Sequence, residues 1–341
     1  MKWLRLTAVV AVLSLAYGCG SPPEDSDKEF TANGDLDSLV SAAKEEGKLT
    51  WYAGLGEATV QKVIAGFEDK YGIKVDYIYG PIGTLSQRFA SERQAGAVQA
   101  DLINTSDLTF FRKALEDKWI TKVDDQDVPA LADWPEDALV DGTYPMIAIG
   151  PLGIAYNTDK VKNPPTDWAD LTSDEFKGQM YIGNPSLLTY RNLYMFLRDE
   201  LGDDAFAKIA SAGKVPESMS AAAQSVAAGE SLVAIPSLDA LVKPLADKGA
   251  PIKMVIPDKT TGVEQYLGVV DEAPHPAAAR LFMNYVLTEE GQELVTDGLY
   301  ASVLPNVPNA LALPKEYVAG LSDAAIADVE TKEIEKFLGI K

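Results

Sequence analysis

The chain has 341 residues, of which 51 are acidic and 30 are basic, and its formal net charge is −21. This charge makes nucleic acid a poor partner, because contacts with phosphates need an excess of basic side chains. The length is sufficient for two domains. The single cysteine, Cys19, excludes an internal disulfide, so the fold must depend on its own core.

The N-terminus has the pattern of an export signal. Two basic residues precede an apolar run over residues 6–17, which is too short to span a bilayer stably. The small Gly18 stands before Cys19, as in bacterial lipoprotein signals, where the cysteine is lipidated and becomes the first residue. We predict a signal peptide over 1–18 and a lipid anchor at Cys19, in the periplasm or at the cell surface. A soluble secreted protein with an incidental cysteine is the alternative.

Residues 19–34 are predicted to be a flexible tether. They are rich in Ser, Pro, Asp and Gly and show no apolar periodicity, so they cannot bury a core. Such a tether would join a lipidated cysteine to the folded body of the protein.

From Asp35 onward, strand and helix signals alternate. A short amphipathic helix is followed by the strand "KLTWY" and by a helix with apolar residues at i, i+3, i+4 and i+7, which ends at Gly72. Two more strands, "IKVDYIY" and "ADLINT", are each followed by a helix. This order is typical of a parallel sheet with crossover helices.

The alternation changes at "GTYPMIAIGPLGIAYNTDKV", where two strand-like pieces flank Gly150 and Pro151 with no helix between them. We interpret this segment as a crossing from one lobe to a second, which has its own strand–helix series, including a helix over 188–201. "EQYLGVV" is the expected return, and two helices near 314–320 and 323–337 are predicted to end the chain. Lobe 1 is assigned residues 35–148 and 262–300, and lobe 2 residues 149–261 and 301–341.

Two such lobes would leave a cleft between them. In open α/β sheets, ligands lie at the carboxyl ends of the strands. Those ends carry "AGLGE", "GPIGT", "NTSD" and "GNPS", each before a helix whose N-terminus offers backbone N–H groups and a partial positive charge.

Three segments, in this order and spacing, resemble the extracellular solute-binding proteins of ABC importers. They are "DSLVSAAKEEGKLTWYAGLGEATVQKVIAGFEDKYGIKVDY", "GPLGIAYNTDKV" and "APHPAAARLFMNYVLTEEGQELV". The most similar branch is the ferric-iron type, which also includes members for phosphates, phosphonates and small organic solutes. The resemblance covers residues 35–341.

The resemblance implies an α/β fold of the two-lobed, type II periplasmic-binding class, with two strand crossovers that form a hinge. It implies a monomer that captures a small solute in the cleft and delivers it to an ABC permease in the inner membrane, with no catalysis and no cofactor.

The iron-binding pattern of the family does not carry over. Ferric members use a His or Glu in the first loop, a Glu after the third strand and two adjacent tyrosines in the second lobe. The matching positions here hold Gly56 or Glu57, Ser106 beside Asp107, and Leu238 beside Asp239. Carboxylates remain but phenolates are missing, so we favour an organic anion or oxyanion and keep ferric iron as the alternative.

In the first lobe, the candidate ligand contacts are Tyr52, Gly54, Gly56, Glu57, Gly83, Thr84, Arg88, Asn104 and Ser106. Each also has a structural interpretation. The glycines could serve only the turns, Glu57 could only favour a helix start, and Thr84 could only cap a helix. In the same way, Ser106 or Asp107 could only cap a helix, and Arg88 could be a solvated surface residue.

In the second lobe and the return strand, the candidates are Asn184, Ser186, Tyr190, Arg191, Ser237, Asp239 and Tyr266. Tyr190 and Arg191 would suit an organic group with a carboxylate, unless Arg191 lies on the outer helix face. Asp239 could pair with an amine or act only as a helix N-terminal acid. Tyr266 could line the hinge or belong to the core.

Two enzyme classes compete with binding as interpretations. Gly54-x-Gly56 and Asp76, about 20 residues further on, resemble a dinucleotide fingerprint, but the third glycine position holds Thr59. Nicotinamide cofactors are also scarce outside the cytoplasm. A hydrolase lacks support, because no G-x-S-x-G is present and His275, the only histidine, lies between two prolines. We therefore predict neither catalytic residues nor a resident metal.

Overall fold

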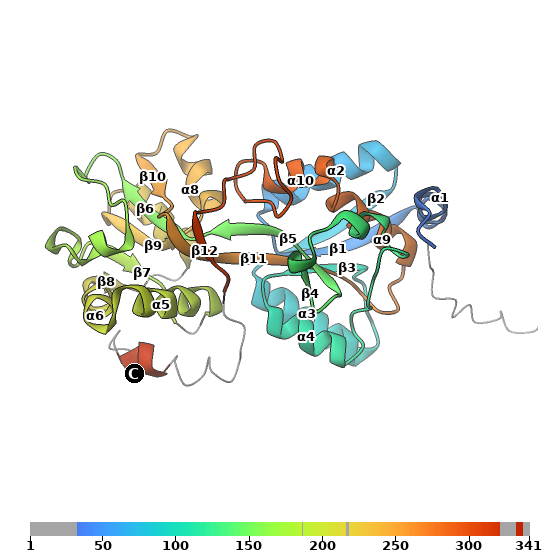
Figure 1. Cartoon of the computed structure of the whole chain (residues 1–341), viewed down its shortest axis with the longest axis horizontal. Coiled ribbons are helices and arrows are strands. Elements are labelled where there is room, and N and C mark those ends of the chain that lie inside the picture. Colours follow the sequence, from blue (N-terminus) through green and yellow to red (C-terminus); the bar gives the residue numbers. More distant parts are fainter. Residues whose placement is uncertain (1–32, 186, 216–217, 321–331, 337–341) are drawn as a thin grey trace, which may run out of the picture. The chain divides into compact units, whose positions relative to one another are not determined.

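The computed structural model describes residues 33–185, 187–215, 218–320 and 332–336. The predicted signal peptide, Cys19, most of the predicted tether and Ser186 lie outside the described residues. Within the described part, the strands form two separate sheets (Figure 1).

The first sheet has the strand order β2-β1-β3-β11-β5-β4, with β12 paired to β11, among the described residues. β1 is parallel to β2 and β3, whereas β11 is antiparallel to β3 and β5. The strand bounds are β1 Lys48–Ala53, β2 Lys74–Tyr79, β3 Leu102–Thr105, β4 Leu139–Val140, β5 Tyr144–Pro151, β11 Lys259–Val269 and β12 Glu316–Val318.

Helices cover both faces of this sheet. Their bounds are α1 Leu36–Glu46, α2 Glu57–Tyr71, α3 Ile82–Ala95, α4 Leu108–Glu116, α9 Pro276–Val286 and α10 Glu289–Thr296. Neighbouring side chains of a strand point to opposite faces. Trp51 of β1 accordingly contacts Phe282 of α9, with ring centroids 5.0 Å apart. The next residue, Tyr52, packs in a second core with Phe89 of α3 and Phe111 of α4.

The second sheet has the order β10-β6-β9-β7-β8 in the described part of the chain. Its strands are β6 Gly153–Asn157, β7 Met180–Ile182, β8 Gly213–Lys214, β9 Val233–Ser237 and β10 Ile252–Val255. Its helices are α5 Leu188–Leu201, α6 Asp203–Ala212, α7 Met219–Ala227 and α8 Asp239–Ala246. Short 3₁₀ helices cover Pro129–Asp133, Glu136–Ala138, Trp168–Thr172 and Asp174–Phe176.

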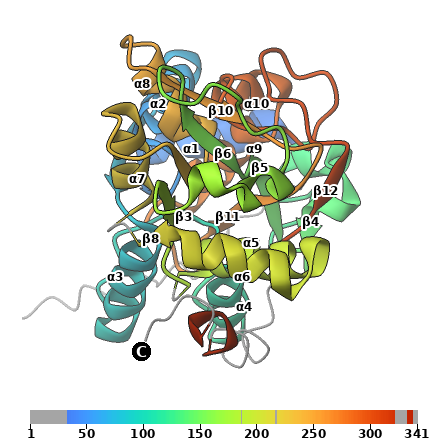
Figure 2. The ribbon, with the colours of Figure 1, turned by 90° about the vertical axis from the view of Figure 1, so that its left-hand side faces the viewer.

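The two faces of the second sheet are packed differently. The face under α5 and α6 carries an aromatic-rich core that includes Trp168, Tyr194 and Phe206. Helices α7 and α8 lie apart from α5 and α6 (Figure 2), and the core that they form with the sheet contains small residues such as Ala222 of α7 and Ala234 of β9. Protein interiors are close-packed, so the size of the side chains must match the space between helices and sheet. Small side chains allow a helix to approach the sheet closely.

The chain passes between the sheets by strand-to-strand crossings, as the sequence predicted. β5 ends at Pro151 and, after one residue, β6 begins in the second sheet. The chain returns from β10 to β11, and the two crossing strands pair with each other from Gly262–Pro151 to Tyr266–Met146. An α/β structure with two sheets and two crossings is thus present.

The prediction of a helix near 314–320 is wrong. Residues Glu316–Val318 form β12, which pairs in parallel with Lys259–Thr261 at the start of β11. The open edge of β11 offers backbone groups that need partners, and this distant pairing decides the conformation. Of the helix predicted over 323–337, only residues 332–336 are described, and they are helical.

Candidate functional site

The first loop, between β1 and α2, is fixed by Asn104 at the end of β3. The N–H groups of Gly54 and Leu55 donate to Asn104 Oδ1 at 3.0 and 2.9 Å. Asn104 Nδ2 donates to Gln265 Oε1 at 3.1 Å and to the Tyr266 carbonyl at 3.0 Å. The buried Asn104 side chain therefore joins β1, β3 and β11, and the structure uses its amide within the protein.

Gly54 is required by close packing. A Cβ at this position would lie 2.8 Å from the carbonyl oxygen of Asn104, which is a backbone atom that cannot turn aside. The predicted role of Gly54 in shaping the turn thus has a direct steric basis, and its N–H is already bonded within the protein.

Gly56 is the N-cap residue of α2, and its N–H donates to the phenol oxygen of Tyr300 at 3.2 Å. Tyr300 follows α10 and is only 5% exposed, and its burial raises its pKa. Glu57, the next residue after Gly56, is exposed in the first turn of α2. Tyr300 is absent from the residues predicted from the sequence, because no motif marks it and it lies far from Gly56 in the chain.

Tyr52 and Arg88 meet at a third residue, Glu92. The Tyr52 hydroxyl donates to both Glu92 carboxylate oxygens, at 2.8 and 2.7 Å, and Arg88 Nε donates to Glu92 at 2.8 Å. The Arg88 guanidinium also lies 5.4 Å from the centre of the Tyr52 ring. Burial, and then the bond to Glu92, raise the pKa of Tyr52 to about 12. The i, i+4 spacing of Arg88 and Glu92 is the sequence signal that could have revealed this group.

The prediction that Thr84 caps a helix is wrong. Pro81 occupies the N-cap position and α3 begins at Ile82, so Thr84 lies inside the first turn and its N–H donates to the Pro81 carbonyl at 2.9 Å. Proline has a fixed φ that suits the start of a helix, and the N-cap of α3 lies three residues before the predicted position. Gly83 and Thr84 are both exposed.

At the end of β3, the predicted capping by Asp107 is confirmed. Its carboxylate accepts from the N–H of Phe110 at 3.0 Å, at the start of α4. Its own N–H donates to Thr105 Oγ1 at 3.1 Å. Ser106 is half-buried between them.

In the second sheet, α5 begins at Leu188 and carries Tyr190 and Arg191, as the sequence predicted for this helix. Tyr190 is buried against Gly183, and this burial raises its pKa to about 12. Arg191 is half-buried and Asn184 is exposed. The structure thus places Tyr190 in the core of this half of the protein.

The turn from β9 to α8 places three residues beside the crossing strand. The Ser237 hydroxyl is buried and has no hydrogen-bond partner among the described residues. A Cβ on Gly150 would lie 3.0 Å from Leu238 Cδ2 and 3.6 Å from the Tyr300 ring, so both side chains pack on Gly150. Asp239 is half-buried at the start of α8, and burial raises its pKa, with partial compensation by Lys243.

Tyr266, a predicted ligand contact, and His275, which was not predicted as a site residue, both make contacts within the protein. Tyr266 of β11 is buried and packs edge-on against Phe111, with ring centroids 6.2 Å apart, and burial raises its pKa.

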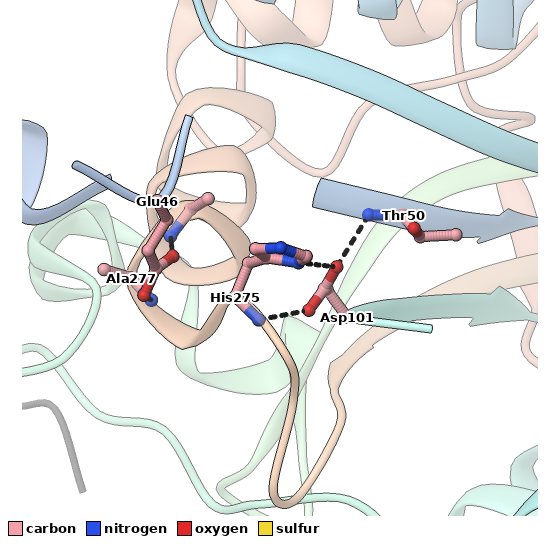
Figure 3. Close-up of polar contacts among 6 residues, drawn as sticks. Glu46, Thr50, Asp101, His275 and Ala277 are labelled. Carbon is pink, nitrogen blue, oxygen red and sulfur yellow. Dashed lines mark hydrogen bonds and ion pairs between the residues drawn. The ribbon is translucent and has the colours of Figure 1, made fainter. Parts of the chain in front are cut away.

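His275 precedes α9 and contacts the buried Asp101 through Nδ1 at 3.0 Å (Figure 3). Asp101 also accepts from the N–H of Thr50 in β1, at 2.7 Å. His275 therefore belongs to a packing contact between the start of α9 and the first sheet.

The acidic residues considered for iron do not converge. Within the ranges that the structure describes, no three His, Cys, Asp or Glu side chains are grouped so that they could hold a metal ion. Over the same residues, no helix has the length and apolar character needed to cross a membrane.

Comparison with known proteins identifies the family. Residues 53–293 match the family model described as bacterial extracellular solute-binding protein. The chain belongs to this family. The predicted resemblance is confirmed, and this solute-binding protein is the component of an ABC importer that binds a small solute and interacts with the membrane permease.

Relatives and solved structures agree with this family. A Salmonella typhimurium protein, provisionally named a 2-aminoethylphosphonate-binding periplasmic protein, is 23% identical over 316 residues, covering 87% of this chain and 83% of the relative. Iron-bound HitA from Pseudomonas aeruginosa superposes with a TM-score of 0.68 at 18% identity, covering 84% and 99% of the two chains. AfuA from Actinobacillus pleuropneumoniae, with fructose-6-phosphate bound, gives 0.65 at 23%, covering 86% and 97%. The two-lobed, type II periplasmic-binding fold is thereby confirmed.

Proposed function

We propose that this solute-binding protein captures a small organic oxyanion where the first loop, the crossing strand β5 and the β9–α8 turn meet. The observation that carries the proposal is the pair Ser237 and Asp239. A buried hydroxyl without a partner in the described structure and a half-buried carboxylate with a raised pKa stand at the carboxyl end of β9. Unsatisfied polar groups and perturbed carboxylates are both typical of ligand sites.

The relatives favour an organic phosphorus oxyanion. The provisional name of the Salmonella relative and the ligand of AfuA both describe an organic group joined to a phosphonate or phosphate. In such a solute, Ser237 would donate to an oxyanion oxygen, and Asp239 would pair with an amine where the solute carries one. Asn184, Ser186, Arg191, Glu57, Thr84 and Ser106 remain candidate contacts.

Ferric iron is the second candidate, because iron-bound HitA shares the fold. Fewer observations in this chain support iron than support an organic oxyanion. Asp107 is used to cap α4, and the acidic residues of the described part form no metal-binding group. Leu238 and Asp239 stand where the ferric branch has adjacent tyrosines. An organic oxyanion therefore fits the side chains better.

We also propose that capture involves closure of lobe 1 (35–148 and 262–300) on lobe 2 (149–261 and 301–341), with β5 and β11 as the hinge. The solute drives closure only if it binds the closed state more tightly than the open one. A lipid at Cys19 would hold the monomer at the membrane near its permease. Mass spectrometry of the exported protein tests this anchor, since Cys19→Ala should remove the added lipid mass.

Native mass spectrometry followed by a thermal-shift screen tests the solute class. The panel contains 2-aminoethylphosphonate, fructose-6-phosphate, inorganic phosphate and ferric citrate. A ligand present at one hundred times its Kd stabilises the folded state by about 2.7 kcal/mol. Stabilisation by an organic phosphorus compound supports the proposal, whereas a response to ferric citrate alone would favour iron.

A further inference from the structure

The backbone N–H of Gly56, at the start of α2, is hydrogen-bonded to a side chain of the protein itself, that of Tyr300. Helix N-termini have N–H groups without intrahelical partners, and these groups commonly bind anions or a capping side chain. Gly56 provides no side-chain cap, and its N–H instead donates to Tyr300 at 3.2 Å. The Tyr300 phenol therefore lies at the position where the sequence predicted a free backbone donor of the first loop.

Tyr300 is held firmly in this position. Its N–H donates to the Thr296 carbonyl at 3.1 Å, and its own carbonyl accepts from Leu311 at 2.9 Å. The following residue, Ala301, forms two hydrogen bonds with Ile149 of β5, at 2.7 and 3.0 Å. A side chain on a backbone fixed on both sides can place its hydroxyl with little loss of conformational entropy.

The Tyr300 hydroxyl still has a proton to donate. Its oxygen accepts from Gly56, and no acceptor for its O–H is found among the residues that the structure describes. Accepting from an N–H polarises a hydroxyl and strengthens it as a donor. Burial raises the pKa of Tyr300, so the phenol stays protonated at neutral pH.

The position of the ring connects the two halves of the proposed site. The Tyr300 ring and the Leu238 side chain pack on the same residue, Gly150. Leu238 lies directly between Ser237 and Asp239, the residues that carry the proposed function. Tyr300 thus lies between the first loop and the β9–α8 turn.

We propose that Tyr300 is a specificity-determining residue, whose hydroxyl donates a hydrogen bond to an oxyanion oxygen of the solute in place of the Gly56 amide. The inference deepens the proposed function and depends on it. A neutral donor at this position would favour solutes that present an accepting oxygen on this side of the site.

Tyr300→Phe tests the inference, because it retains the ring on Gly150 and removes only the donor. The matched control is Tyr285→Phe in α9, a fully buried phenol whose oxygen has no hydrogen-bond partner among the described residues. Isothermal titration of the whole protein with 2-aminoethylphosphonate, fructose-6-phosphate and inorganic phosphate gives the Kd values. Loss of a hydrogen bond to a charged group should weaken binding about ten- to a hundredfold, with Tyr285→Phe unchanged.

The outcomes separate the two proposals. If wild type binds one of these compounds and Tyr300→Phe binds it equally well, the role of Tyr300 is wrong and the proposed function stands. If wild type binds none of them and native mass spectrometry finds no retained oxyanion, the proposed function fails and Tyr300 loses its role with it. Tighter binding by Tyr300→Phe would also contradict the inference, since it would mean that the phenol only blocks the Gly56 amide.

Discussion

The phenol of Tyr317 in β12 donates a hydrogen bond to the carboxylate of Glu264, which is 8% exposed in the crossing strand β11. The N–H of Gly320 donates to the same carboxylate at 3.0 Å. Burial, and then the negative charge of Glu264, raise the pKa of Tyr317, so the phenol remains a donor. The C-terminal segment thereby satisfies a buried charge in a strand that joins the two sheets.

Tyr317→Phe should destabilise the protein, because it leaves a buried carboxylate with one donor fewer. The expected loss in the free energy of unfolding is about 1–3 kcal/mol, measured by urea denaturation. Glu264→Gln combined with Tyr317→Phe should cost less than the sum of the single changes, since the two groups interact directly. Strict additivity would show that the negative charge of Glu264 does not strengthen the bond, since the glutamine oxygen can still accept from Tyr317.

Asp101→Asn should be more harmful than His275→Ala. The buried Asp101 carboxylate accepts from the backbone N–H of Thr50 at 2.7 Å and of His275 at 2.6 Å, and from the His275 ring at 3.0 Å (Figure 3). An amide has one accepting oxygen, so Asp101→Asn leaves a buried backbone N–H unsatisfied, at about 1–3 kcal/mol. His275→Ala retains both backbone bonds. Equal denaturation midpoints for the two variants would contradict this ranking.

The parts of the fold that could be predicted have local signals. The apolar spacing of Val60, Val63, Ile64 and Phe67 predicted the buried face of α2. Gly72 was predicted to end a helix, and it has the left-handed conformation that glycine adopts easily. The crossing at Gly150 was visible because two apolar strand segments follow each other without a helix.

The parts that could not be predicted depend on contacts between distant residues. β12 is a strand only because β11, more than fifty residues earlier, offers an open edge. The four hydrogen bonds of Asn104 involve the first loop, after β1, and strand β11. Tyr300 reaches Gly56 from the other end of the chain. The candidate ligand residues themselves remain predictions.

Asp239→Asn should change stability in a pH-dependent way. The folded-state pKa of Asp239 is raised by burial, so its contribution to stability is fully present below the unfolded pKa of about 3.9 and is lost as the pH rises through the folded value. The variant is neutral throughout and should therefore have a higher Tm than wild type at pH 7. This advantage should shrink towards pH 3.5. A Tm difference that does not change with pH would show that the carboxylate is not destabilised in the fold.

Gly54→Ala and Gly83→Ala form a matched pair that tests the first loop. A Cβ at Gly54 would lie 2.8 Å from the Asn104 carbonyl oxygen, whereas a Cβ at Gly83 meets nothing within 4 Å. Gly83 lies inside α3, so alanine there should stabilise the protein by roughly 0.5–1 kcal/mol. Gly54→Ala should destabilise it, because the backbone of β3 must move, and this shift would also displace Gly56 relative to Tyr300. The Tm values of both variants, from thermal unfolding, measure the difference. Equal stability of Gly54→Ala and Gly83→Ala would mean that the first loop accommodates the added Cβ without loss of stability.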